Sequence, residues 1–105
     1  MTWSILARTD DGRFGAAIAS RFFAVGALCV HTRAGVGAVA TQALVNPNYG
    51  PRGLDLLAAG HDAVAVVQAL LAADEGRAQR QVHVLPLEGE GAAHTGAACV
   101  DWCGH

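Results

Sequence analysis

Six polar side chains gather just after a nearly all-apolar segment of the chain. Their amide, hydroxyl and guanidinium groups can donate hydrogen bonds to carbonyl or carboxylate oxygens, or stabilise a developing oxyanion. Because loops on a rigid scaffold often carry sites, we expect this group to bind a substrate. Its members are Thr41, Gln42, Asn46, Asn48, Tyr49 and Arg52. The alternative is a structured loop in which the asparagines bond the backbone and Arg52 pairs with Asp55.

Two further candidates stand at the ends of predicted strands. Arg21 can bind a substrate carboxylate through its forked guanidinium, and the alternative is a solvated surface arginine. His94 is the best histidine for proton transfer, since an unperturbed imidazole has a pKa of about 6.5. The alternative for His94 is a half-buried, hydrogen-bonded side chain. His31 and His83 fall inside strand patterns, and we interpret both as structural.

Alternating polar and apolar residues predict strands in two blocks separated by helices. The predicted strands span 2–8, 14–20, 27–32, 36–42, 80–87 and 92–95, with a further short strand over 99–102. Asp11-Gly12 is a strong signal for the tight turn of the first hairpin. Strands and helices in separate blocks predict the α+β class, with an antiparallel or mixed sheet and helices packed on a face.

Two helices are predicted between the strand blocks. The first covers 51–59, because Pro51 suits the opening position of a helix and Gly60 suits its end. The second covers 63–73, with Asp62 as its N-cap and apolar residues spaced for packing on a sheet.

The composition describes one apolar domain over residues 1–105. Hydrophobic residues make up 52% of the chain and charged residues 15%, with a net charge of −2. This excludes a disordered chain. The basic residues are scattered arginines, so we expect no nucleic-acid partner. No apolar run approaches the roughly 18 residues of a membrane span, and no signal peptide is evident. We therefore expect no membrane partner.

The chain has three cysteines, an odd number, which does not fit a framework of paired disulfides. Cys29, Cys99 and Cys103 therefore predict a reduced, cytoplasmic setting. The spacing from Cys99 through Cys103 to His105 fits no common zinc pattern. We expect no metal site and no cofactor.

Several segments spread over the whole chain resemble one protein family. They are Trp3–Ala7, Ala19–Phe22, Ala24–Gly26, Ala34–Gln42, Asn46–Leu54, Ala93–Ala97 and Trp102–His105. On these segments the sequence resembles DUF1028, a family of bacterial proteins of uncharacterised function. The resemblance implies the fold of the N-terminal-nucleophile (Ntn) hydrolases. In that fold two antiparallel sheets stack between helix layers, an αββα sandwich.

Family members are typically longer, and this chain resembles only their N-terminal half. We therefore expect a partial domain, which could be a fragment or truncated product, a chain completed by a partner or by self-association, or half of a processed precursor. The expected partner is a missing C-terminal half or a second copy of the chain. The high apolar fraction agrees with a face that such a partner covers.

The resemblance also implies a nucleophile at the start of the chain. An Ntn hydrolase uses the side chain of its first residue as nucleophile and its own α-amine as base. Thr2 would become that residue if Met1 were removed, and Ser4 is a second candidate that needs a side-chain base. The implied function is hydrolysis of an amide or lactam with Thr2, Ser4 and His94 as catalytic residues. The alternative is a non-catalytic domain that binds a small ligand or self-associates.

Overall fold

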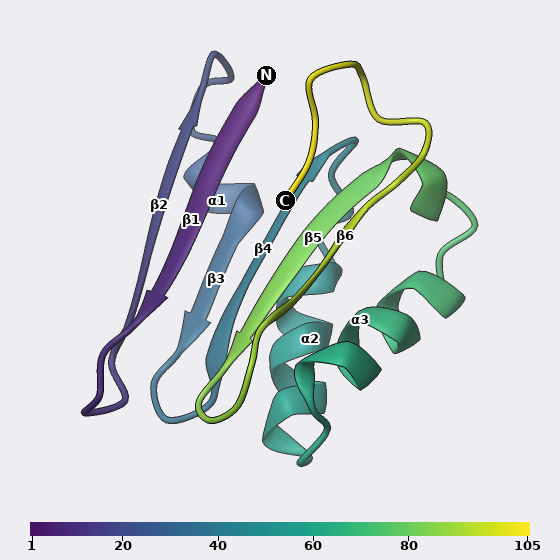
Figure 1. Ribbon diagram of the computed structural model, residues 1–105. Helices are drawn as coiled ribbons and strands as arrows, with labels where there is room; N and C mark the ends of the chain where they lie inside the picture. The colour runs from purple at the N-terminus through teal and green to yellow at the C-terminus, as the bar shows by residue number, and fades with distance from the viewer.

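A computed structural model describes all of the chain, from Met1 to His105. Six strands form two separate antiparallel sheets, and two longer helices lie against the larger sheet (Figure 1). The predicted α+β class is therefore confirmed. No helix has both the length and the apolar character that crossing a membrane would require.

The first sheet is a hairpin of β1 (Thr2–Arg8) and β2 (Phe14–Ser20). The two strands pair over their full length, from Thr2 opposite Ser20 to Arg8 opposite Phe14. Gly12 in the turn has φ +80°, a backbone conformation that glycine adopts without steric cost. The hairpin therefore forms where the sequence predicted it, with the same bounds.

The second sheet has four strands in the order β3-β4-β5-β6, each antiparallel to its neighbour. Their bounds are Val30–Arg33, Gly37–Ala43, Arg80–Pro86 and Ala92–Thr95. Two sequence-based expectations fail here. The segment before β3 forms the short helix α1 (Gly26–Cys29), because the backbone N–H groups of Leu28 and Cys29 bond to the carbonyl of Val25. No strand forms over 99–102, where Trp102 has φ +64° and cannot continue an extended backbone.

Helices α2 (Tyr49–Ala58) and α3 (Ala63–Ala72) cover one face of the four-stranded sheet. Asp62 caps α3 as predicted, since its carboxylate accepts the N–H of Ala65 at 2.8 Å. The 3₁₀ turn η1 (Arg77–Gln79) then leads into β5. The core between helices and sheet consists of Val39, Tyr49, Leu54, Ala63, Val66, Val67, Leu70, Val82 and Val84.

The β1–β2 hairpin packs on the opposite face of the larger sheet. Successive side chains of a strand point to opposite faces, so β5 sends Val82 and Val84 to the helices and His83 toward the hairpin. Thr2 and Ser4 face the larger sheet, whereas Trp3 on the outer face of the hairpin is 68% exposed. The polar side chains of both sheets therefore meet in the layer between them.

Thr41 lies on the helix side of β4, opposite Val82, and is fully buried. Its hydroxyl oxygen has no hydrogen-bond partner. The structure therefore places Thr41 in the core, and its expected substrate-binding role stays a prediction.

Replacing Thr41 with valine should stabilise the protein. A buried hydroxyl without a partner costs about 1 kcal/mol or more, and valine fills nearly the same space without that cost. We expect the free energy of unfolding of Thr41→Val, measured in urea, to rise by about 1 kcal/mol. Thr32→Val, at an exposed position of β3, is the matched control and should change stability little. A loss of stability in Thr41→Val would show that the hydroxyl does have a partner.

Candidate functional site

Ser4 stands at the centre of the polar layer between the sheets. Its hydroxyl oxygen lies 2.6 Å from Oε1 of Gln42 on β4 and 2.9 Å from Nε2 of His83 on β5. Both partners come from neighbouring, inward-facing positions of the larger sheet, with Gln42 paired to Gln81 and Ala40 paired to His83. Strand pairing therefore places the amide near the imidazole, and the packing of the hairpin on the larger sheet adds the hydroxyl.

Two glutamines extend this contact into a directed chain of hydrogen bonds. The amide nitrogen of Gln42 donates to the backbone carbonyl of Thr2 at 3.0 Å and to Oε1 of Gln81 at 2.7 Å. The amide nitrogen of Gln81 donates to the carbonyl of Gly104 at 2.7 Å and to the hydroxyl of Thr95 at 2.9 Å. Backbone carbonyls only accept hydrogen bonds. The carbonyls of Thr2 and Gly104 therefore fix the orientation of both amides.

The fixed amides decide where the proton of Ser4 lies. Oε1 of Gln42 can only accept, so Ser4 donates its single proton to that oxygen. His83 must then carry a hydrogen on Nε2 and donate it to the oxygen of Ser4. Nδ1 of His83 is left as an acceptor whenever the ring is neutral. The network thus assigns the tautomer of His83.

The surroundings of His83 favour the neutral ring. Burial, which disfavours a charged imidazole, and secondarily the charge of nearby His105 lower the pKa of His83 from its ordinary value of 6.5. His83 is therefore neutral at pH 7.

A hollow of about 500 Å³ opens beside Ser4 and His83. Its polar lining comes from Ser4, Gln42, Gln81, His83 and His105, and the remaining lining is apolar side chains and backbone. Its lining residues come mainly from β1, β5 and the start of β6, with Gly104 and His105 from the C-terminal segment.

Thr2 joins the same hydrogen-bond network through its backbone carbonyl, which accepts from Gln42. Its hydroxyl oxygen is 3.0 Å from the hydroxyl of Ser20 on β2. Ser20 donates its own proton to the carbonyl of Met1 at 3.4 Å and accepts the N–H of Phe22 at 3.2 Å. Because Ser20 has only one proton, Thr2 is the donor in the contact between the two hydroxyls.

The rest of the predicted binding group is dispersed. Asn46 and Tyr49 both donate to the carboxylate of Asp74, at 3.0 and 2.8 Å. The backbone N–H of Asn48 bonds to the side chain of Asn46, as in the alternative of a structured loop. Asn46 and Tyr49 therefore hold the loop to the start of β5, and of the six residues only Gln42 reaches the hollow.

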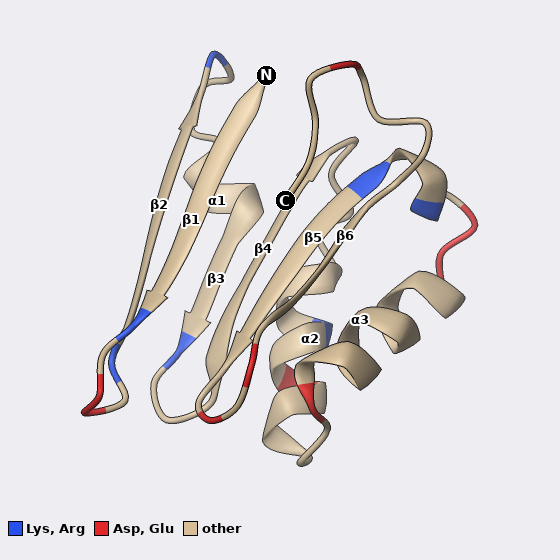
Figure 2. Ribbon diagram, in the orientation of Figure 1, with Lys and Arg blue, Asp and Glu red and all other residues tan.

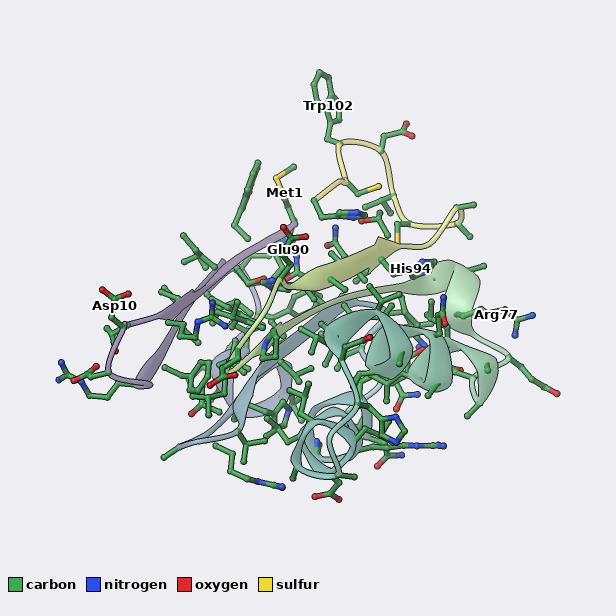
Figure 3. All side chains as sticks on the ribbon, turned by 60° about the horizontal axis from the view of Figure 1, so that its bottom comes forward. Met1, Asp10, Arg77, Glu90, His94 and Trp102 are labelled. Carbon is green, nitrogen blue, oxygen red and sulfur yellow. The ribbon has the colours of Figure 1, made fainter.

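The predicted charged residues also lie elsewhere. Arg21 and Arg52 are exposed, and Asp55 pairs with Arg33 at 2.9 Å instead of with Arg52. His94 is paired with Val82, which places it on the helix side of the sheet, and its Nε2 lies 3.3 Å from the carbonyl of Arg77 (Figure 3). The structure therefore does not bring His94 to Thr2 or Ser4.

Sequence reasoning missed three residues of the site, Gln81, His83 and His105. The available signal was strand parity, since Gln81 and His83 alternate with buried valines and so share the face opposite the core. His105 could not be placed, because its contact with Thr95 at 2.9 Å depends on the path of the C-terminal segment. No three His, Cys, Asp or Glu side chains are grouped as a metal site would need.

A two-sheet α+β fold with polar residues between the sheets and a helix layer on one side defines the structural class. The chain belongs to DUF1028, described as a family of unknown function, which it matches over residues 2–105. The resemblance inferred from the sequence is therefore confirmed.

A solved structure supports the same assignment. The chain is similar to protein SPO2555 from Silicibacter pomeroyi, a DUF1028 protein, with 32% identity and a TM-score of 0.91. The match covers 96% of this chain and 48% of that protein, so the chain spans about half the length of this relative. No curated protein matches the chain.

Asp74 is the best-connected carboxylate of the structure and should control its acid stability. Besides Asn46 and Tyr49 it binds Nε of Arg80 at 2.8 Å and the N–H of Gly76 at 2.8 Å. Arg80 first, and then Asn46, hold the pKa of Asp74 well below its usual value. A depressed carboxyl pKa stabilises the folded state above pH about 4, and this contribution is lost as the pH falls further.

We therefore expect Asp74→Asn to lower the free energy of unfolding at pH 7 by about 2 kcal/mol, since it leaves the partly exposed guanidinium of Arg80 without its counter-charge. The difference from the unmodified protein should shrink as the pH falls toward about 3. Urea unfolding at several pH values measures both effects. Asp10→Asn, in the exposed hairpin turn, is the control. A constant difference at all pH values would contradict the assignment.

Proposed function

We propose that the protein is a hydrolase of the N-terminal-nucleophile type that cleaves an amide or lactam, with Thr2 as the nucleophile after removal of Met1. The observation that carries the proposal is the position of Thr2, which opens β1 with its hydroxyl on Ser20 and its carbonyl held by Gln42. Both contacts fix the first residue of the shortened chain relative to the hollow. The implied Ntn fold of the family supports the same assignment.

The proposed reaction uses only groups of this chain. The hydroxyl oxygen of Thr2 attacks the amide carbon, and its proton passes to the free α-amine of Thr2. The C–N bond then breaks, the leaving nitrogen takes that proton, and an ester remains on Thr2. Water, deprotonated by the same amine, attacks the ester carbon, the C–O bond to Thr2 breaks, and the amine returns the proton to the oxygen of Thr2. An α-amine has a pKa of about 7.7–8.0, so it can accept a proton near neutral pH.

Met1 blocks this chemistry in two ways. It occupies the α-amine of Thr2 in a peptide bond, and its carbonyl takes the proton of Ser20. Removal of Met1 frees that proton, so Ser20 can donate to the oxygen of Thr2 and stabilise negative charge there. Loss of Met1 therefore frees the α-amine of Thr2 to act as a base. It also reverses the direction of the hydrogen bond between Thr2 and Ser20.

Ser4 is the weaker candidate for the nucleophile. Its proton is directed to Gln42, and His83 approaches it as a donor. Activation would require the hydrogen of His83 to move from Nε2 to Nδ1 and the Ser4 hydroxyl to rotate away from Gln42. We assign Ser4 and His83 to the wall of the binding hollow.

Covalent labelling tests the proposed nucleophile. Protein lacking Met1 should be acylated by a β-lactone probe on Thr2, as read by mass spectrometry of peptides. Thr2→Ala should lose the label, whereas Thr2→Ser should keep it because serine retains the hydroxyl. Ser4→Ala is the matched control and should still be labelled on Thr2. A label on Ser4 that depends on His83 would instead support the second nucleophile, and no label on either would contradict the hydrolase.

A second candidate function is self-association, favoured by the outer face of the hairpin. Trp3 is 68% and Ile5 is 64% exposed there, and Phe22 and Phe23 in the next loop are 69% and 100% exposed. Large exposed apolar patches mark association sites. In this proposal, the face is covered by a second copy of the chain or by the remaining half that the longer relative possesses.

We propose that the protein acts in the cytoplasm.

Solution mass separates association from a free monomer. We expect light scattering after gel filtration to give a mass above that of one chain. Trp3→Ser combined with Ile5→Ser should reduce it to the monomer, because both side chains leave the outer face. Trp102→Ser is the control, since Trp102 is 91% exposed in the C-terminal segment, away from that face (Figure 3). A monomeric unmodified protein would contradict self-association.

A further inference from the structure

The lining of the hollow carries no charged side chain of the Asp, Glu, Lys or Arg type. Its fourteen lining residues are polar amides, hydroxyl and imidazole groups, apolar side chains and glycines. The charged residues of the chain lie instead at turns, strand ends, helices and the loop after α3, and the middles of β1, β4 and β5 carry none (Figure 2). A ligand in the hollow therefore meets no Arg, Lys, Asp or Glu side chain.

Most polar groups of the lining are already used by the protein. The amide nitrogens of Gln42 and Gln81 each donate twice, and Ser4 both donates and accepts. These groups cannot turn toward a ligand without leaving a buried partner unpaired, which is costly. The lining is therefore preorganised and has few free positions.

Nδ1 of His83 is one of the free positions. No protein group bonds it, and it is not sealed, because Thr41 Oγ1 is the only sealed side-chain polar atom without a partner. The direction of the glutamine chain places the ring hydrogen on Nε2, so Nδ1 presents a lone pair. A bound molecule must therefore offer a donor to satisfy His83.

We infer that the hollow binds an uncharged molecule that donates an N–H to Nδ1 of His83, the chemical class of primary and secondary carboxamides. An anion would face the lone pair of Nδ1 and find no Arg or Lys side chain, whereas a cation would find no Asp or Glu side chain. A charged ligand would therefore be bound less favourably than a neutral one that donates an N–H. As a substrate class the inference rests on the proposed function, because an amide is the substrate that the proposed reaction cleaves.

Four compounds that share one benzene ring test the inference separately from the chemistry. Benzamide is neutral with an N–H, N,N-dimethylbenzamide is neutral without one, benzoate is an anion and benzamidine a cation. Binding to Thr2→Ala, which lacks the proposed nucleophile, is followed at pH 7.5 by NMR of the imidazole nitrogens and the glutamine amides. We expect benzamide to bind at least about tenfold more tightly than each of the other three, a difference typical of one lost hydrogen bond or an unpaired charge.

A matched pair of variants locates the contact. His83→Gln keeps a donor where Nε2 contacts Ser4 but has no atom equivalent to Nδ1, so the preference for benzamide over N,N-dimethylbenzamide should disappear. His61→Gln, at an exposed histidine, should keep it. In the free protein, the imidazole spectrum should show the hydrogen of His83 on Nε2, a measurement that needs no variant to fold.

Equal binding of the four compounds, tighter binding of benzoate or benzamidine, no binding of benzamide, or a hydrogen on Nδ1 would each overturn the inference. The outcome is independent of labelling at Thr2. A benzamide preference without a Thr2 label leaves a binding protein and removes the hydrolase, whereas a label without the preference removes only the substrate class.

Discussion

The direction of one chain of hydrogen bonds organises the space between the two sheets. The carbonyls of Thr2 and Gly104 can only accept, so they orient the amides of Gln42 and Gln81. Through Gln42 this orientation reaches Ser4, and through Ser4 it sets the tautomer of His83. Toward the hairpin, β4 presents the small side chains of Ala38 and Ala40 beside Gln42. The bonds through Gln42 therefore contribute to the position of β1, and with it of Thr2.

The sequence predicts most elements of this fold because their signals are local. The hairpin turn at Gly12 and the cap at Asp62 each involve residues a few positions apart, and both form as predicted. The candidate site could not be predicted equally well. The polar loop looks like a binding group only while Asp74, which lies 25 and more positions further along the chain, is ignored. Asn46 and Tyr49, which we expected to contact a ligand, therefore bind Asp74 and have a structural role.

His83 illustrates the opposite error. Its place inside a strand indicated a structural histidine, yet the alternation that buries Val82 and Val84 puts His83 on the face that meets β1. The sequence contains that parity, but it does not state which second sheet lies against the free face. Only the stacking of the hairpin on β4 and β5 reveals that a hydroxyl of β1 lies opposite this imidazole. Residue type alone therefore favoured His94, which faces the helices instead.

The hydrogen bonds of Ser4 and Thr2 distinguish the two hydroxyls that are candidates for the nucleophile. Ser4 is saturated in the folded protein, because it donates to Gln42 and accepts from His83, and no change at the chain terminus alters either contact. Thr2 is different, since its partner Ser20 gives its only proton to the carbonyl of Met1. Removing Met1 abolishes that acceptor and creates a base on the same residue. In the proposed function, the hydrogen-bond pattern therefore links Thr2, and not Ser4, to the removal of Met1.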